Sequence, residues 1–101
     1  MLALNITVPA GEIAFFCQRW NISELSLFGS VLRDDFTPQS DVDVLVSFSP
    51  AAEISLFDLA QMQIELQGLF KHPVDIIEKE ALRNPYRKRE ILSTARLIYE
   101  A

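Results

Sequence analysis

The sequence has one cysteine, one histidine and three glycines among its 101 residues, and each scarcity excludes a class of site. Cys17 alone cannot form an intramolecular disulfide or a two-thiolate site, so a reducing, cytoplasmic compartment is expected. His72 alone excludes an H-E-x-x-H motif and any other multi-histidine metal site. The few glycines leave no room for a G-x-x-x-x-G-K-[ST] loop or a G-x-G-x-x-G turn.

Long apolar runs and strong basic charge are also missing. No stretch approaches the ~18 apolar residues of a spanning helix, so no membrane association is expected. The start, residues 1–9, lacks the basic flank and small-residue cleavage pattern of a signal peptide. The net charge of −5 argues against nucleic-acid binding by charge alone, and no direct nucleic-acid partner is expected.

The charge is unevenly distributed along the chain. Residues 1–80 contain four basic and twelve acidic residues, whereas residues 81–101 contain five basic and two acidic ones. Two interpretations of this basic segment stay open: its side chains form a solvated helix face, or some of them contact an anion. The five are Arg83, Arg87, Lys88, Arg89 and Arg96.

No repeat, low-complexity tract or linker divides the chain, so residues 1–101 are predicted to form a single domain. Helical periodicity, apolar runs and turn residues predict an alternation of helices and strands. The result is an α/β fold, a small mixed sheet of about four strands flanked by helices. The predicted helices cover 10–20, 30–36 (a short turn), 55 to 66–70 and 85–94; the strands cover 24–28, 41–48, 73–78 and, in preference to a longer last helix, 96–99.

Three local patterns refine this prediction. Ser55 and Asp58 match a capping box at the start of the third predicted helix, and Gly68 is placed in its last turn, where it could help end it. Cys17 falls in the apolar stripe of the first helix and is therefore interpreted as core rather than as a nucleophile. His72 stands at a strand entrance, where a structural or solvated role is favoured over ligand contact.

Carboxylates occupy unusual positions in the predicted sheet. Asp41 and Asp43 lie in a strongly apolar strand, two residues apart, so both side chains point to one face with Cα atoms roughly 6.6 Å apart. Such a pair repels unless a cation lies between the carboxylates, and oxygen ligands suit Mg²⁺ or Mn²⁺. Asp75 interrupts the next apolar strand and lies across from the pair if the two strands are neighbours. The alternative is that these residues are exposed strand ends.

Gly29 and Ser30 end one predicted strand and open a helical turn. Backbone amides there can form an anion pocket, glycine lets a phosphate approach closely, and the Ser30 hydroxyl can donate to a phosphate oxygen. Alone, such a pair is usually only a turn. Combined with a dicarboxylate metal site, this phosphate pocket suits an enzyme that transfers a group at a phosphorus atom. A third carboxylate would accept the proton of the attacking hydroxyl.

These residues resemble a known superfamily. Gly29-Ser30, ten residues, and then Asp41-Val42-Asp43 form the G-S-x10-D-x-D signature of the nucleotidyltransferases that include DNA polymerase beta. The surrounding text is similar to the minimal nucleotidyltransferase (MNT) group over about residues 10–100. It comprises LFGSVLRDDFTPQSDVDVLVSF, PVDIIEKEAL and NPYRKREILSTARLIYE.

The resemblance implies a polymerase beta-like nucleotidyltransferase fold and an antitoxin of a HEPN/MNT toxin–antitoxin pair. Such antitoxins transfer AMP from ATP to a tyrosine of a helical HEPN ribonuclease toxin and so silence it. By position, Gly29 and Ser30 would bind the nucleotide phosphates, and Asp41 and Asp43 would hold Mg²⁺. Asp75 matches the third carboxylate, as metal ligand or general base. Arg33 falls where relatives often carry a basic residue and is assigned to nucleotide binding.

Three hypotheses follow for the function. The leading one is a Mg²⁺-dependent adenylyltransferase acting on a protein hydroxyl. Because the chain lacks the substrate-binding domains of larger relatives, the acceptor is expected on a protein partner, docked against exposed surface such as residues 83–96. The second is an inactive antitoxin that masks its toxin sterically, and the third is a small-molecule nucleotidyltransferase.

Overall fold

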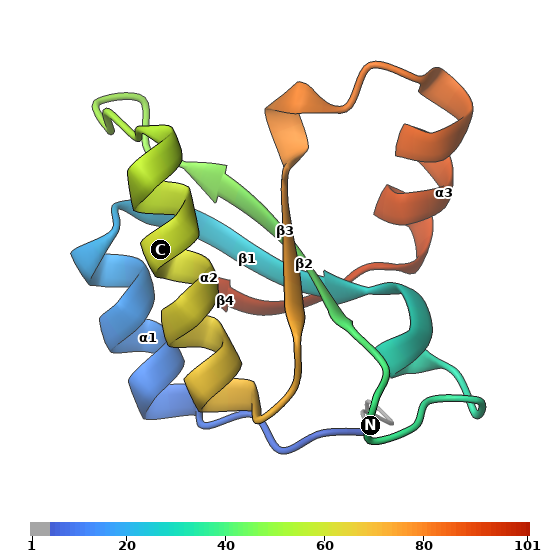
Figure 1. The fold of residues 1–101 in the computed structure, drawn as a ribbon. Helices are drawn as coiled ribbons and strands as arrows, with labels where there is room; N and C mark the ends of the chain where they lie inside the picture. The colour runs from blue at the N-terminus through green and yellow to red at the C-terminus, as the bar shows by residue number, and fades with distance from the viewer. Residues whose placement is uncertain (1–4) are drawn as a thin grey trace.

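The computed structural model describes residues 5–101 and contains three α-helices, two short 3₁₀ turns and four strands (Figure 1). The first four residues, part of the segment considered above for a leader, lie outside the described range. The predicted α/β alternation is confirmed. In chain order the elements are α1 (Ala10–Arg19), β1 (Ile22–Phe28), η1 (Gly29–Leu32), β2 (Val42–Phe48), α2 (Leu56–Phe70), β3 (Val74–Glu78), η2 (Lys79–Ala81), α3 (Pro85–Thr94) and β4 (Arg96–Glu100).

The four strands form one mixed sheet in the order β3-β2-β1-β4. β1 runs antiparallel to both β2 and β4, whereas β2 and β3 are parallel. The parallel pair requires a crossover, and α2 supplies it. The tail predicted as a strand is therefore the edge strand β4, beside β1 and far from β3 in the sheet.

Alternation along β2 divides the apolar side chains between the two faces of the sheet. Val42, Val44 and Val46 join the main core with residues of α1 and α2. Leu45 packs instead in a smaller cluster with Phe28, Leu82 and Ile91, which includes α3. Asp43 has the parity of Leu45, so its side chain lies on the face that α3 borders.

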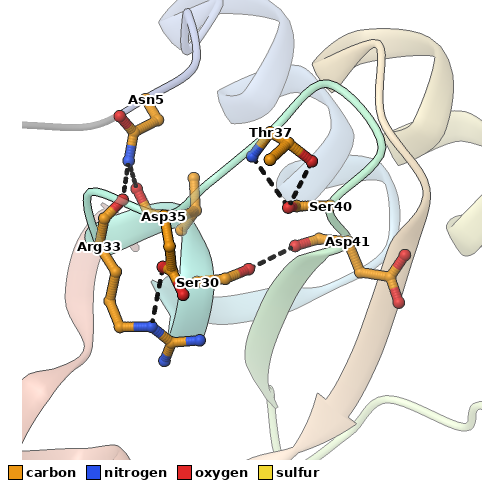
Figure 2. A network of polar contacts seen from close by, with 8 residues as sticks. Asn5, Ser30, Arg33, Asp35, Thr37, Ser40 and Asp41 are labelled. Carbon is orange, nitrogen blue, oxygen red and sulfur yellow. Dashed lines mark hydrogen bonds and ion pairs between the residues drawn. The ribbon is translucent and has the colours of Figure 1, made fainter.

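Three predicted boundaries are wrong by a few residues. The turn after β1 is a single 3₁₀ turn that ends at Leu32, and Arg33 returns to extended backbone. The Asn5 amide donates to the carbonyls of Val31 and Arg33, which satisfies the end of this turn (Figure 2). β1 begins earlier than predicted, at Ile22, and β2 begins at Val42, so Asp41 immediately precedes the strand.

The end of α2 lies at the limit of the predicted range, but Gly68 does not end the helix. The helix continues past Gly68 to Phe70, and Lys71 ends it in the left-handed conformation, with φ 62° and ψ 31°. The Lys71 amide donates to the carbonyl of Gln67. Gly68 is thus an interior helical residue with open space around its Cα.

The capping box at the start of α2 is confirmed. The Asp58 amide donates to the Ser55 hydroxyl at 3.1 Å, and the Ser55 amide donates to the Asp58 carboxylate at 3.0 Å. Ser55→Ala should lower the free energy of unfolding by about 1 kcal/mol, because the Asp58 amide loses its side-chain acceptor. Urea unfolding measures this, and Ser55→Asp, which keeps an acceptor, should retain most of the stability. An equal loss in both variants would contradict a capping role.

Candidate active site

The two acidic strand segments meet at one end of the sheet. Asp43 of β2 is the register partner of Asp75 of β3, and Asp41 lies directly before β2. Asp43 is half-buried, whereas Asp41 and Asp75 are exposed. The sequence placed Asp75 opposite the pair only if the strands were neighbours, and the parallel pairing of β2 with β3 meets that condition.

Gly29 lies directly against the Asp43 carboxylate. Its φ of +75° is a conformation that residues with a side chain rarely adopt. A Cβ at this position would collide with Oδ2 of Asp43. Two features therefore each favour glycine at position 29: the left-handed backbone conformation and the close approach of the Asp43 carboxylate.

Ser30 connects the turn to the residue before β2. Its hydroxyl donates to the backbone carbonyl of Asp41 at 3.2 Å (Figure 2). The preceding loop is closed by the Thr37 amide, which donates to the Ser40 hydroxyl at 2.9 Å. Asp41 is thus positioned by η1 on one side and by its own loop on the other, and its carboxylate points away from both in Figure 2.

Arg33 follows η1 and is exposed. Its Nε donates to the Asp35 carboxylate at 3.3 Å, a contact between two largely solvated side chains. Such an ion pair contributes little to stability, about 0–1 kcal/mol. The Arg33 guanidinium is therefore easily available to another anion.

The surroundings of Asp43 disfavour the ionised form of its carboxyl. Burial raises the pKa of its carboxyl above the ordinary value, and the negative charges of Asp75 and Asp41 raise it further. The positive charges of Arg33 and Arg87 act in the opposite direction. Ionised Asp43 is thus disfavoured by its surroundings, as expected where carboxylates share a site without a cation.

The raised pKa of Asp43 predicts how stability depends on pH. The folded protein holds this proton more tightly than the unfolded chain does, so stability falls as pH rises through the interval above the ordinary pKa of 3.8. In the absence of divalent cations, Asp43→Asn should therefore raise the melting temperature at pH 7. This gain in melting temperature should become smaller as the pH is lowered toward the ordinary pKa of 3.8. Asp34→Asn is the matched control; a less stable Asp43→Asn protein at pH 7 would contradict the account.

The carboxylates fit a magnesium ion that also binds a phosphate ligand. Within residues 5–101, no three acidic, histidine or cysteine side chains converge closely enough to hold a metal by themselves. Magnesium, however, is commonly held by one or two carboxylates together with substrate phosphates. Asp41 and Asp43 supply all-oxygen donors of this kind, and the repulsion acting on Asp43 is the feature that a cation would relieve.

A cavity of about 540 Å³ borders Gly29 on the face that carries α3. It extends between η1, α3 and the start of β4, and its basic lining residues are Arg33, Arg87 and Arg96. The sequence left Arg87 and Arg96 as either solvated or in contact with an anion, and it did not place them beside Gly29. Only the strand order does so: Arg96 of β4 pairs with Leu27, two residues before Gly29.

Cys17 and His72 lie apart from this cavity. Cys17 is fully buried in the main core, and burial raises the pKa of its thiol to about 12, so the predicted core role is confirmed. His72 contacts the Phe36 ring and has Nδ1 3.3 Å from the Ser40 carbonyl. That contact is structural, as predicted, and it supports the loop that leads to Asp41.

Comparisons with known proteins identify the kind of domain. The family model of the nucleotidyltransferase domain matches residues 13–98. MJ0126 of Methanocaldococcus jannaschii, a proposed protein adenylyltransferase, is 32% identical over 74 residues, which is 73% of this chain and 74% of that protein.

Solved structures share the fold over most of the chain. A proposed minimal nucleotidyltransferase is 30% identical and covers 85% of both chains, with a TM-score of 0.68. A toxin–antitoxin complex with AMP-PNP gives a TM-score of 0.73 at 14% identity, over 93% of this chain and 75% of that one. A complex of tri-AMPylated Shewanella oneidensis HEPN toxin with MNT antitoxin gives 0.65 at 14%, over 91% and 70%. At 14% identity these two complexes establish the fold alone.

None of the helices among residues 5–101 has the length and apolar character needed to cross a membrane.

Proposed function

The chain belongs to the nucleotidyltransferase domain family, in its minimal form, and on this premise we propose that it transfers AMP from ATP to a tyrosine hydroxyl of a helical HEPN-type toxin. The observation that carries the proposal is the contact of Gly29 with Asp43. This contact brings the Gly29 turn, proposed to bind phosphate, next to Asp41 and Asp43, the carboxylates proposed to bind Mg²⁺. The cytoplasm, where ATP is made, is the proposed location.

The transfer is a displacement at the α-phosphorus of ATP. The tyrosine oxygen forms the new bond to phosphorus, the bond to the oxygen shared with the β-phosphorus breaks, and pyrophosphate leaves with that electron pair. The Gly29 turn approaches the phosphates closely, and the Ser30 hydroxyl can exchange its bond to the Asp41 carbonyl for a phosphate oxygen. Asp75, exposed opposite Asp43, is the candidate acceptor of the tyrosine proton.

Asp41 and Asp43 would hold Mg²⁺, with Asp75 as a further candidate ligand. When bound, the ion would offset the charge of the triphosphate and of the developing pyrophosphate. Arg33 would add a positive charge on the same side of the turn. Each of these roles belongs to the proposal, and the similarity to nucleotidyltransferases supports it.

The toxin partner is supported by the likeness to toxin–antitoxin complexes, one of which contains an AMPylated HEPN toxin. The main alternative is that the chain masks its partner sterically without chemistry. Whether inhibition of the partner requires ATP distinguishes AMP transfer from steric masking. If the proposal is correct, loss of the partner's ribonuclease activity should require Mg²⁺ and ATP, and should persist after the two proteins are separated. Inhibition without ATP, reversed on separation, would favour masking.

A further inference from the structure

The cavity beside Gly29 has a mixed wall. Its apolar part includes Phe28, Leu32 and Ile91, and its polar part includes Ser93 and Thr94 of α3. A volume of about 540 Å³ lies in the usual range for small-molecule sites, ~300–1,000 Å³. Since Gly29 also contacts Asp43, one glycine borders both the carboxylates and the cavity.

The charge of the cavity is positive on balance. Arg33, Arg87 and Arg96 line it, against one carboxylate, that of Glu90. Arg33 is paired with Asp35, whereas Arg87 and Arg96 make no ion pair within the part of the chain that the structure describes. Both side chains are exposed and line the same cavity, so an anion that enters the cavity can be contacted by two guanidinium groups.

We propose that Arg87 of α3 and Arg96 of β4 bind the β- and γ-phosphates of the nucleotide and hold pyrophosphate as it leaves. The inference rests on the proposed function and names residues for the part of the donor that is not transferred. Arginine suits this task because its planar guanidinium can make two parallel hydrogen bonds to a phosphate. The triphosphate would pass over Gly29, with its α-phosphate near Asp43 and its far end in the cavity.

Placement of pyrophosphate in this cavity also has a kinetic consequence. When the bond between the α-phosphorus and the bridging oxygen breaks, that oxygen acquires negative charge. Positive groups aimed at this charge stabilise the transition state more than the ground state. Arg87 and Arg96 should therefore affect the transfer rate as well as the binding of ATP.

Binding measurements with three probes test the proposal. Titration calorimetry in Mg²⁺ compares ATP, pyrophosphate and AMP for wild type, Arg87→Ala and Arg96→Ala. Each substitution should weaken ATP and pyrophosphate binding about 10- to 100-fold, the usual effect of losing one charge-assisted hydrogen bond, while AMP binding changes less than about twofold. Arg83→Ala and Arg89→Ala remove exposed charges that do not line the cavity and should leave all three affinities unchanged.

The possible failures are distinguishable. If wild type does not bind ATP, the proposed function itself fails, and this inference with it. If wild type binds ATP but Arg87→Ala and Arg96→Ala bind it as tightly, only the inference fails. A parallel loss of AMP affinity would place the nucleoside, rather than the pyrophosphate, in the cavity. Arg87→Lys, which keeps the charge without the planar fork, should lie between wild type and Arg87→Ala.

Discussion

Replacing Asp41 and Asp43 together by Asn should reduce the rate of AMP transfer by about 10³-fold or more, because both ligands proposed for the metal ion are lost. Asn keeps the size of each side chain but removes its negative charge. The half-buried Asp43 is destabilised in its ionised form, so the double variant should be folded and no less stable than wild type. Steady-state transfer assays and thermal unfolding, run on the same preparations, measure both effects.

Asp34→Asn is the matched control for this prediction. Asp34 is an exposed acid between η1 and β2, and the same chemical change there should leave transfer unchanged. A double variant of Asp41 and Asp43 that retained more than about a tenth of the wild-type rate would contradict the assignment, since removing even one charge-stabilising group usually costs about 10²-fold or more.

Gly29→Ala should abolish nucleotide binding and also destabilise the fold. The φ of +75° costs an alanine roughly 1–2 kcal/mol. The new Cβ would also displace the Asp43 carboxylate. We therefore expect a lower melting temperature and the loss of measurable ATP binding, even at a temperature where the variant is fully folded.

Gly68→Ala provides the contrasting control. Gly68 lies inside α2, and nothing is close enough to obstruct a Cβ there. Alanine in a helix interior is better than glycine by about 0.5–1 kcal/mol, so this variant should be more stable and bind ATP normally. If Gly29→Ala bound ATP as wild type does, the turn could not be the phosphate-binding element.

Much of this architecture could be predicted from sequence because the signals are local. The apolar stripe of α1 buries Ile13, Phe16 and Cys17, and the capping box begins α2 at the predicted residue. The acids could be noticed because each lies in or directly before an apolar strand, where Asp is disfavoured. Gly29, Ser30, Asp41 and Asp43 could be recognised as one motif because their spacing resembles the nucleotidyltransferase signature.

The remaining features depend on contacts between distant segments. The collision of a Gly29 Cβ with Asp43 requires the pairing of β1 with β2, and the basic cavity requires β4 to lie beside β1. Arg87 and Arg96 are exposed like the other basic residues of 83–96, and no periodicity in the sequence shows that these two line the cavity. Gly68 does not end α2, because Lys71, rather than a glycine, adopts the left-handed conformation.

The central claim is that this chain moves the adenylyl group, and the position of a radioactive label tests it most directly. The chain is incubated with Mg²⁺ and the proposed HEPN-type partner, using ATP labelled at either the α- or the γ-phosphate. The account predicts that the partner acquires α-label on a tyrosine and no γ-label, and that the double variant of Asp41 and Asp43 transfers neither. Transfer of γ-label, or an unlabelled partner that the chain nevertheless inhibits, would contradict it.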